Sequence, residues 1–282
     1  MKQEQNTEKE REFTFTDEDF AFLAKLVNDH TGIVLPAHKR NMVYSRLARR
    51  LRALHLSTFK EYCHLLTAEN NDDELGNFIN AITTNLTNFF REGHHFEHLE
   101  KLLTDYTSTA KQKRLRIWSC ASSSGPEPYS IAMVVAKVLE RKPGWDAKIL
   151  ATDIDTNMLA TAIHGEYSED VMEKIPSAYH SYVTRYGASE KGMIRMTDPI
   201  RQLLTFKQLN LLHNWPMKGP FDIVFCRNVV IYFDKDTQRV LFDRIADILT
   251  PNGTLYIGHS ENLFNVCNRF ESKGRTIYQR IT

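Results

Sequence analysis

Hydrophobic and polar positions follow two different patterns along this chain. In residues 13–88 the apolar positions recur every three to four residues, which is the spacing of one face of a helix. The first such stretch starts near Phe20. Thr16 precedes it as a candidate helix cap, and Gly32 and Pro36 follow it as stop signals. The pattern predicts an all-α N-terminal domain over residues 13–88.

Beyond Arg114 the pattern changes to short apolar runs. They are RLRIWSC, AKILATDI, LLTFKQLNL, FDIVFCRNVVIYF and GTLYIGHS. The first, second and fourth are each followed by helical periodicity, which is typical of a parallel sheet covered by helices. We therefore predict an α/β domain over residues 89–282. Within 168–206 the alternation lapses, and the runs MIRM and LLTF predict a small antiparallel insertion. Residues 264–281 predict a closing hairpin that turns near Lys273.

Composition narrows the class of protein. The 282 residues are 42% hydrophobic and 25% charged with a net charge of +1, which is ordinary for a globular protein and gives no overall attraction to nucleic acid. No apolar stretch is long enough to span a membrane, and residues 1–12 are polar and predicted to be a disordered tail. The cysteines are widely spaced and form no CxxC pair, so we expect neither a disulfide framework nor a metal site.

Polar residues that could carry chemistry follow the first two predicted strands. The small-residue loop SCASSSGPEPYS lets a ligand approach the backbone closely at the mouth of an open α/β sheet. The dinucleotide fingerprint GxGxxG is absent, and for this loop alone a plain tight turn is an equal alternative. After the second strand, Asp153 can accept hydrogen bonds from both hydroxyls of a ribose. Asp155 or Thr156 can instead cap the next helix.

Two further segments stand out by their polar residues. FCRNVVIYF places Arg227, Asn228 and Tyr232 in a strongly apolar run. A buried arginine needs a partner, so a salt bridge with a nearby acid is the alternative to a binding role. TNLTNFFRE lies where the two patterns meet. Taken alone, it reads most simply as a helix start capped by Thr87 or Asn88.

Together these segments resemble one known family. TNLTNFFRE, SxxSSGxEPYS, ATDID, NLL and FCRNVxIYFD occur in this order, followed by GHSEN and preceded by the basic YSRLARRLRAL. The set is similar to the CheR-type chemotaxis receptor methyltransferases over residues 13–281. The resemblance implies an S-adenosylmethionine-dependent protein-glutamate O-methyltransferase. Its expected fold is an all-α N-terminal domain and a class I, Rossmann-like methyltransferase domain with a small inserted antiparallel β-subdomain.

The resemblance also implies roles for individual residues. Cofactor contacts are assigned to Asn85, Thr87, Arg91, Glu127, Asp153, Asn210, Leu211, Arg227 and Asn228. Arg91 and Tyr232 are expected to lie where the methyl group leaves and to orient the acceptor. One departure is visible, because the family usually reads GEEPYS and this chain has Pro126 in place of the first glutamate. Proline removes a backbone N–H, which puts the loop geometry and the cofactor affinity in question.

The expected reaction needs no general base. A glutamate side chain has a pKa of about 4.3 in solution and is ionised at neutral pH. The motifs contain no obvious His–Asp pair, in keeping with this. The enzyme must instead align the carboxylate oxygen, the methyl carbon and the sulfonium, and remove water from the nucleophile. His94 and His98 lie four residues apart on a predicted helix without a third ligand, so we expect surface histidines and no metal.

A basic stretch in the first domain suggests a partner. Residues 36–56 hold six Lys or Arg and no Asp or Glu. At helical spacing an apolar stripe is formed by Val43, Leu47, Leu51 and Leu54, and a separate basic stripe by Lys39, Arg46, Arg49 and Arg50. A solvated helix face is the plain explanation, whereas the resemblance implies binding to the cytoplasmic helices of the receptor. It also implies that the β-insertion, with its loop 186–192, can dock a C-terminal receptor pentapeptide by strand addition.

Two alternatives remain open. A nucleic-acid methyltransferase could use the basic helix to track phosphates, but the near-neutral charge argues against it. A non-catalytic module could bind S-adenosylmethionine or receptor tails without turnover, and Pro126 is its only sequence support. We expect a cytoplasmic monomer with no nucleic-acid partner and no membrane insertion.

Overall fold

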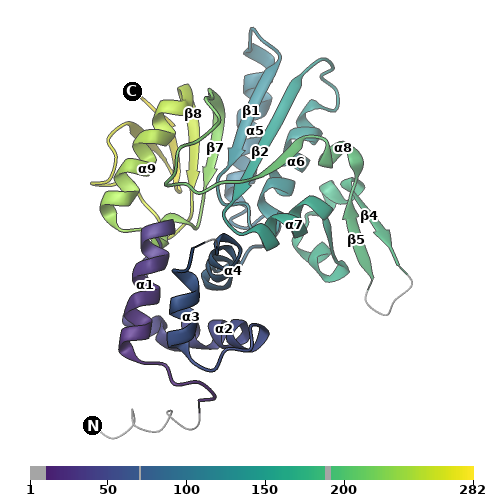
Figure 1. Cartoon of the computed structure of the whole chain (residues 1–282). Helices are drawn as coiled ribbons and strands as arrows, with labels where there is room; N and C mark the ends of the chain where they lie inside the picture. The colour runs from purple at the N-terminus through teal and green to yellow at the C-terminus, as the bar shows by residue number, and fades with distance from the viewer. Residues whose placement is uncertain (1–10, 70, 188–191) are drawn as a thin grey trace, which may run out of the picture. The chain divides into compact units, whose positions relative to one another are not determined.

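The computed structural model describes residues 11–69, 71–187 and 192–282 (Figure 1). The chain divides into two compact units between Thr84 and Asn85. Each unit has its own hydrophobic core. Of the tail predicted over residues 1–12, residues 1–10 lie outside the described residues.

The first unit is helical, as predicted. Its helices are α1 (Asp17–Thr31), α2 (Arg40–Ala53), α3 (Phe59–Leu66) and α4 (Asp72–Ile82). The predicted ends of α1 are confirmed: the Thr16 side chain accepts a hydrogen bond from the Asp19 N–H, and Gly32 closes the helix at a φ of 72°. The predicted apolar stripe is also confirmed, since Val43 and Leu47 of α2 are fully buried.

The second unit is built on a seven-stranded sheet in the order β6-β2-β1-β7-β8-β10-β9. The strands are β1 (Arg114–Ser119), β2 (Asp146–Asp153), β6 (Leu204–Gln208), β7 (Phe221–Cys226), β8 (Leu249–Ile257), β9 (Phe270–Gly274) and β10 (Ile277–Arg280). The first five in spatial order are parallel, and β10 runs antiparallel to both of its neighbours, β8 and β9. The predicted parallel sheet and closing hairpin are therefore confirmed.

Helices follow the strands that were predicted to have them. They are α5 (His94–Thr109) before β1, then α6 (Pro126–Leu139), α7 (Thr156–His164) and α9 (Lys235–Ile248) after β1, β2 and β7. The chain moves outward from β1 to β2 and β6, but in the opposite direction from β7 to β8. Right-handed crossovers therefore put α6 and α7 on one face and α9 on the other, and α9 lies across the strands from α6 in Figure 1.

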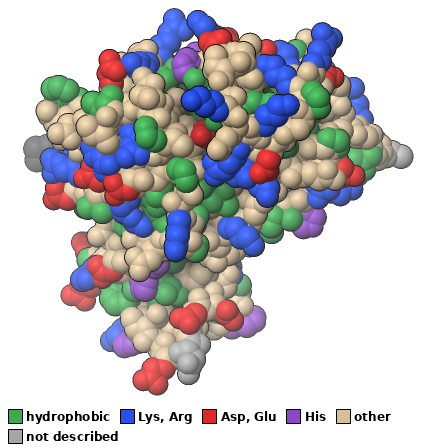
Figure 2. Space-filling model, turned by 90° about the horizontal axis from the view of Figure 1, so that it is seen from above, with side chains coloured by type: hydrophobic (Ala, Val, Ile, Leu, Met, Phe, Trp, Pro, Cys, Tyr) green, Lys and Arg blue, Asp and Glu red, His purple; other side chains and the backbone are tan. Residues whose placement is uncertain are grey.

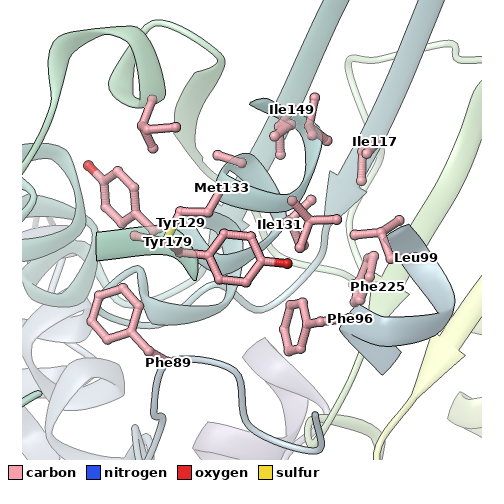
Figure 3. Packing of buried hydrophobic residues seen from close by; sticks show 14 of the residues in the cluster. Phe89, Phe96, Leu99, Ile117, Tyr129, Ile131, Met133, Ile149, Tyr179 and Phe225 are labelled. Atoms are coloured by element: carbon pink, nitrogen blue, oxygen red, sulfur yellow. The ribbon is translucent and has the colours of Figure 1, made fainter. Parts of the chain in front are cut away.

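The hydrophobic core of this unit packs helices α5 and α6 against the sheet. Five consecutive apolar residues of α6, from Ile131 to Val135, are fully buried, as expected for a helix that is apolar all round. Figure 3 shows Phe96 of α5 and Phe225 of β7 within the same cluster, and their ring centroids are 6.2 Å apart. Tyr256 of β8 stacks on Phe225 at 4.2 Å.

A separate three-stranded antiparallel sheet is inserted between α7 and β6. Its strands are β3 (Glu166–Ser168), β5 (Met193–Met196) and β4 (Val183–Tyr186), in the order β3-β5-β4. The MIRM run forms β5, as predicted. The prediction that LLTF belongs to this sheet is wrong, because Leu204 pairs with Ile149 of β2 in the main sheet. The short helix α8 (Asp198–Arg201) ends the insertion just before this strand.

Within the described ranges, no helix has both the length and the apolar character needed to cross a membrane.

Candidate active site

The loops at the carboxyl ends of the parallel strands have an unusual backbone. Phe90, Glu92, Ser123 and Asn228 all have positive φ, between 49° and 59°, although none is glycine. Such conformations cost free energy and cluster where a protein holds functional groups in place. Phe90 and Glu92 also show that TNLTNFFRE does not start a helix. The capped-helix interpretation is therefore wrong, and α5 begins only at His94.

The loop after β1 is shaped by one glycine and one proline. Gly125 has a φ of 104°, and a Cβ atom there would lie 2.6 Å from the Tyr167 hydroxyl oxygen, so no other residue fits without rearrangement. Pro126 is the first residue of α6. A proline at that position costs no hydrogen bond, because the first N–H groups of a helix have no intrahelical partner. Pro126 is thus compatible with the loop geometry.

Asp153 ends β2 as a buried carboxylate. Its Oδ2 accepts a hydrogen bond from the Ser123 N–H at 2.7 Å, and its Oδ1 from the Asp155 N–H at 2.9 Å. Burial raises the pKa of Asp153 to about 6, against these hydrogen bonds. Asp155 caps α7, as its alternative reading proposed. Its second oxygen accepts a hydrogen bond from the Asn85 side chain at 2.8 Å, which brings Asn85 to the same loop.

Arg227 lies between two carboxylates. Its Nη1 is 2.8 Å from Glu127 Oε2, and its Nη2 is 3.3 Å from Glu92 Oε2. Nη2 also donates to the Arg91 carbonyl at 2.6 Å. Arg227 is only 4% exposed, so the salt-bridge interpretation is correct. If Arg227 also contacts a cofactor, it does so while its two terminal nitrogens remain paired with Glu127, Glu92 and the Arg91 carbonyl.

The two carboxylates beside Arg227 differ in their electrostatics. Burial raises the pKa of Glu127, and the opposing pull of Arg227 does not cancel this. Burial also acts on Glu92, but Arg227 and the hydrogen bond from His259 outweigh it and lower the pKa of Glu92 to about 2. Glu127 has a second donor in the Ser119 hydroxyl, 2.8 Å from its Oε1. Both carboxylates are thus held in fixed directions at the sheet edge.

The remaining candidate residues lie at the same edge with different degrees of contact. Asn210 and Leu211 follow β6, and the Asn210 Oδ1 accepts a hydrogen bond from the Leu212 N–H at 2.9 Å. Tyr232 ends a 3-10 turn after β7 and is half-buried. The half-buried Arg91 donates to the Leu86 carbonyl at 2.9 Å. Among the contacts of the described residues, none joins Arg91 to Tyr232.

The four residues of the predicted basic stripe fall into two pairs: two contact residues of α4 or its end, and two are exposed to solvent. Arg46 donates to the carbonyls of Ile82 and Thr83, both at 2.6 Å, where α4 ends. Arg50 forms a two-point ion pair with the buried Glu74. Lys39 and Arg49 are exposed. Arg46 and Arg50 therefore tie α2 to α4, and only the other two side chains point freely to solvent.

Comparison with known proteins decides the family. Residues 85–279 match the family described as CheR methyltransferase, SAM binding domain, and residues 18–83 match its all-alpha domain. The chain is 42% identical over 266 residues to the chemotaxis protein methyltransferase of Escherichia coli, covering 93% of this chain and 91% of that protein. It is also 42% identical to chemotaxis protein methyltransferase 2 of Pseudomonas aeruginosa, covering 95% of each.

The chain belongs to the CheR methyltransferase family. It is an S-adenosylmethionine-dependent methyltransferase. Solved structures match it at low scores. One is a magnesium protoporphyrin IX methyltransferase from Synechocystis with bound S-adenosylhomocysteine, at a TM-score of 0.32 and 13% identity, covering 62% of this chain and 61% of that one. Such a likeness adds nothing to the family assignment.

The site of this CheR-family enzyme fits S-adenosylmethionine chemically. Buried polar atoms without a hydrogen-bond partner in the described part of the protein include Ser122 Oγ and Arg227 Nε. Together with the Asp153 carboxylate, they indicate a polar ligand at the ends of β1, β2 and β7. When bound, the cofactor supplies an electrophilic methyl group on a sulfonium. Asp153 would hold the ribose and Glu127 the methionine end.

His94 and His98, the two histidines predicted to lie at the surface, are both partly exposed. His98 is half-buried, and its Nδ1 lies 2.8 Å from the Tyr256 hydroxyl. Glu92, His94 and His95 have ligand atoms within 4.8 Å of one another. A cation there would meet the Arg227 guanidinium, which is already 3.3 Å from Glu92 Oε2, so the cluster does not favour a metal.

Sequence reasoning assigned no role to several residues that shape the site. Ser119 and Glu92 hold the charged groups described above, and Glu261 accepts backbone hydrogen bonds from the loop that carries Asn228. A His–carboxylate pair is also present, since His259 Nδ1 lies 2.9 Å from Glu92 Oε1. The available signal was position: Glu92 and Glu261 stand inside the motifs TNLTNFFRE and GHSEN, next to buried runs.

Proposed function

We propose that this enzyme transfers the methyl group of S-adenosylmethionine to glutamate side chains of chemotaxis receptors. The products are glutamyl methyl esters and S-adenosylhomocysteine, and the role is chemotactic adaptation. The observation that carries the proposal is the likeness to chemotaxis protein methyltransferases, 42% identical over nearly the whole chain. It also supports a cytoplasmic location, and we propose a monomer that binds no nucleic acid.

The chemistry of the site supports a carboxylate acceptor. An ionised glutamate attacks the methyl carbon without losing a proton, so the chain has to orient and desolvate it rather than deprotonate it. One histidine at this edge, His259, is paired with Glu92, whose charge is already shared with Arg227. We assign Arg91 and Tyr232 to orienting the acceptor. Neither should bind the carboxylate tightly, because negative charge disappears from it in the transition state.

A labelled-methyl assay tests the proposal. Full-length enzyme, S-adenosylmethionine with a labelled methyl group and receptor-bearing membranes should give label that mild alkali releases as methanol, as expected for an ester. The Arg91→Ala and Tyr232→Phe variants should lower kcat while they still bind S-adenosylhomocysteine. The His259→Gln variant should keep most of the turnover. Alkali-stable label, or turnover that depends on His259, would contradict a carboxylate acceptor.

We propose that Lys39 and Arg49 are the part of the basic stripe that contacts the acidic receptor helices. Both are exposed, whereas Arg46 and Arg50 have partners in α4. The Lys39→Glu/Arg49→Glu variant should raise KM for the receptor at low salt with unchanged affinity for S-adenosylhomocysteine. The matched control is Lys25→Glu/Lys60→Glu, at exposed lysines of α1 and α3. An equal KM in both variants would remove the proposal.

We also propose that the small sheet can take up a C-terminal receptor pentapeptide as an added strand. β4 lies at an edge of this sheet, and an edge strand offers unpaired backbone groups. Residues 188–191 of the predicted loop lie outside the described residues. Calorimetry with a receptor C-terminal peptide is the test, and an absence of binding at millimolar peptide would exclude this docking mode.

A further inference from the structure

Glu261 holds the loop after β7 from one side. It is 6% exposed and lies beyond the end of β8. Its Oε1 accepts a hydrogen bond from the Val230 N–H at 3.0 Å, and its Oε2 from the Asn228 N–H at 3.0 Å. The Gly258 N–H donates to Oε2 as well. One carboxylate therefore satisfies three backbone donors that no strand or helix satisfies.

Gln238 holds the same loop from the other side. It lies on α9 and is 8% exposed. Its Nε2 donates to the Val230 carbonyl at 2.8 Å and to the Phe233 carbonyl at 3.0 Å. Val230 is thus fixed through its N–H by Glu261 and through its carbonyl by Gln238. The loop has little regular structure of its own. The side chains of Glu261 and Gln238 therefore satisfy the backbone N–H and carbonyl groups that a sheet or helix would otherwise satisfy.

The contact between the loops after β7 and β8 leaves little space. A Cβ atom on Gly258 would lie 2.3 Å from the Asn228 Nδ2 and 2.9 Å from the Asn228 backbone nitrogen. Asn228 itself is held at a φ of 57°, a conformation that only favourable surroundings maintain. In this conformation its N–H points at Glu261. The carboxylate and the left-handed residue therefore support each other.

We propose that Glu261 is a positioning residue for methyl transfer, with Gln238 as its complement. It fixes the loop that carries Arg227 and Asn228, assigned to the cofactor, and Tyr232, assigned to the acceptor. The inference rests on the proposed function of that loop. It assigns the role to the two acceptor oxygens of the carboxylate, because a neutral amide offers one acceptor oxygen and presents an NH₂ group to the remaining N–H donors.

The test compares two nearly isosteric changes at opposite ends of the same strand. Glu261→Gln alters the carboxyl end of β7. Asp222→Asn alters its start, where Asp222 Oδ2 accepts the Arg116 N–H at 2.7 Å. For Glu261→Gln we expect the Kd for S-adenosylhomocysteine and the KM for S-adenosylmethionine to rise about tenfold, which corresponds to about 1.4 kcal/mol, with a further fall in kcat. For Asp222→Asn we expect Kd, KM and kcat within about twofold of wild type.

The possible outcomes distinguish a failure of the Glu261 inference from a failure of the proposed function. Equal losses of urea stability in both variants, with Kd and kcat unchanged in both, would reduce Glu261 to a structural role and overturn the inference. If Glu261→Gln fails to fold, Gln238→Leu removes the other half of the support, and a Kd equal to wild type would then overturn it. A wild-type enzyme that binds S-adenosylhomocysteine but leaves receptors unmethylated would contradict the proposed function without touching the Kd comparison.

Discussion

Charged side chains are buried at one end of the parallel sheet and exposed at the other. At the carboxyl ends, Glu127, Asp153, Arg227 and Glu261 are each less than 10% exposed and have several partners. At the opposite end, the Arg116–Asp146 ion pair joins β1 to β2, and the Asp146 side chain is 54% exposed. Figure 2 looks onto the end where β1 and β2 begin, and shows Lys and Arg side chains spread among Asp and Glu.

The difference shows which charges are arranged for a ligand. A buried charge is costly unless it is paired and hydrogen-bonded, so four buried charges gathered at one edge of a sheet indicate a functional site. Exposed pairs cost little and contribute little. Left-handed residues are also more frequent at the carboxyl ends, where Glu92, Ser123 and Asn228 adopt this conformation, than near the start of β8, where Asn252 does. Burial of charge and backbone strain thus indicate the same edge independently.

The largest effect should come from removing the central charge at the carboxyl ends. Arg227→Met leaves Glu127 and Glu92 buried without their cation, and we expect a loss of about 3–5 kcal/mol in the free energy of unfolding. Urea denaturation measures it. Glu127→Gln added to Arg227→Met should recover part of the loss, since one stranded charge is then removed. A double variant less stable than the single one would show that Glu127 does not depend on Arg227.

A second prediction concerns pH. Because the pKa of Asp153 is raised from 3.8 to about 6, the folded state favours the protonated carboxyl. Its contribution to stability is full below pH 3.8 and is lost as pH rises through about 6. At 1.36 kcal/mol per pH unit this amounts to about 3 kcal/mol. Cofactor affinity should change in the opposite direction, because the ionised carboxylate is the form that accepts both ribose hydroxyls.

Measurements at pH 5 and 7.5 test both trends. Between these values the wild type should lose unfolding free energy and gain affinity for S-adenosylhomocysteine. Asp153→Asn has no titrating group there, so its curves should be flatter than those of wild type in both assays. Other titrating groups affect wild type and variant alike, and the difference between them isolates Asp153. Identical slopes would mean that Asp153 does not titrate in this range, and would contradict the prediction.

The local signals in the sequence predicted the elements well. Thr16 and Gly32 bound α1 as expected. β2 ends at Asp153, and β7 ends at Cys226, directly before Arg227. These features depend on neighbours along the chain. The short LLTF run was misassigned because three apolar residues and one threonine fit a strand of the small antiparallel sheet and an edge strand of the main sheet equally well.

Partners distant in the sequence were not predictable in the same way. Arg227 required an acid, but the residues that pair with it are Glu92 and Glu127, at least 100 positions away. Arg46 and Arg50 looked like one exposed stripe because the helix α4 that receives them cannot be placed by periodicity. Side-chain pairing depends on tertiary structure, whereas residue spacing reports only the face of an element.

The smallest effect should come from the exposed end of the sheet. Arg116 and Asp146 lie close enough for a charged hydrogen bond, and the Arg116 hydrogen bond lowers the pKa of Asp146. Water screens the pair, so Asp146→Asn should leave the urea midpoint, cofactor affinity and turnover indistinguishable from wild type. The same exchange at Asp153, where the carboxylate ends the same strand β2, should change all three. A clear loss of stability in Asp146→Asn would mean that exposure is a poor guide to which charges of this sheet matter, and would weaken the assignment of the carboxyl ends.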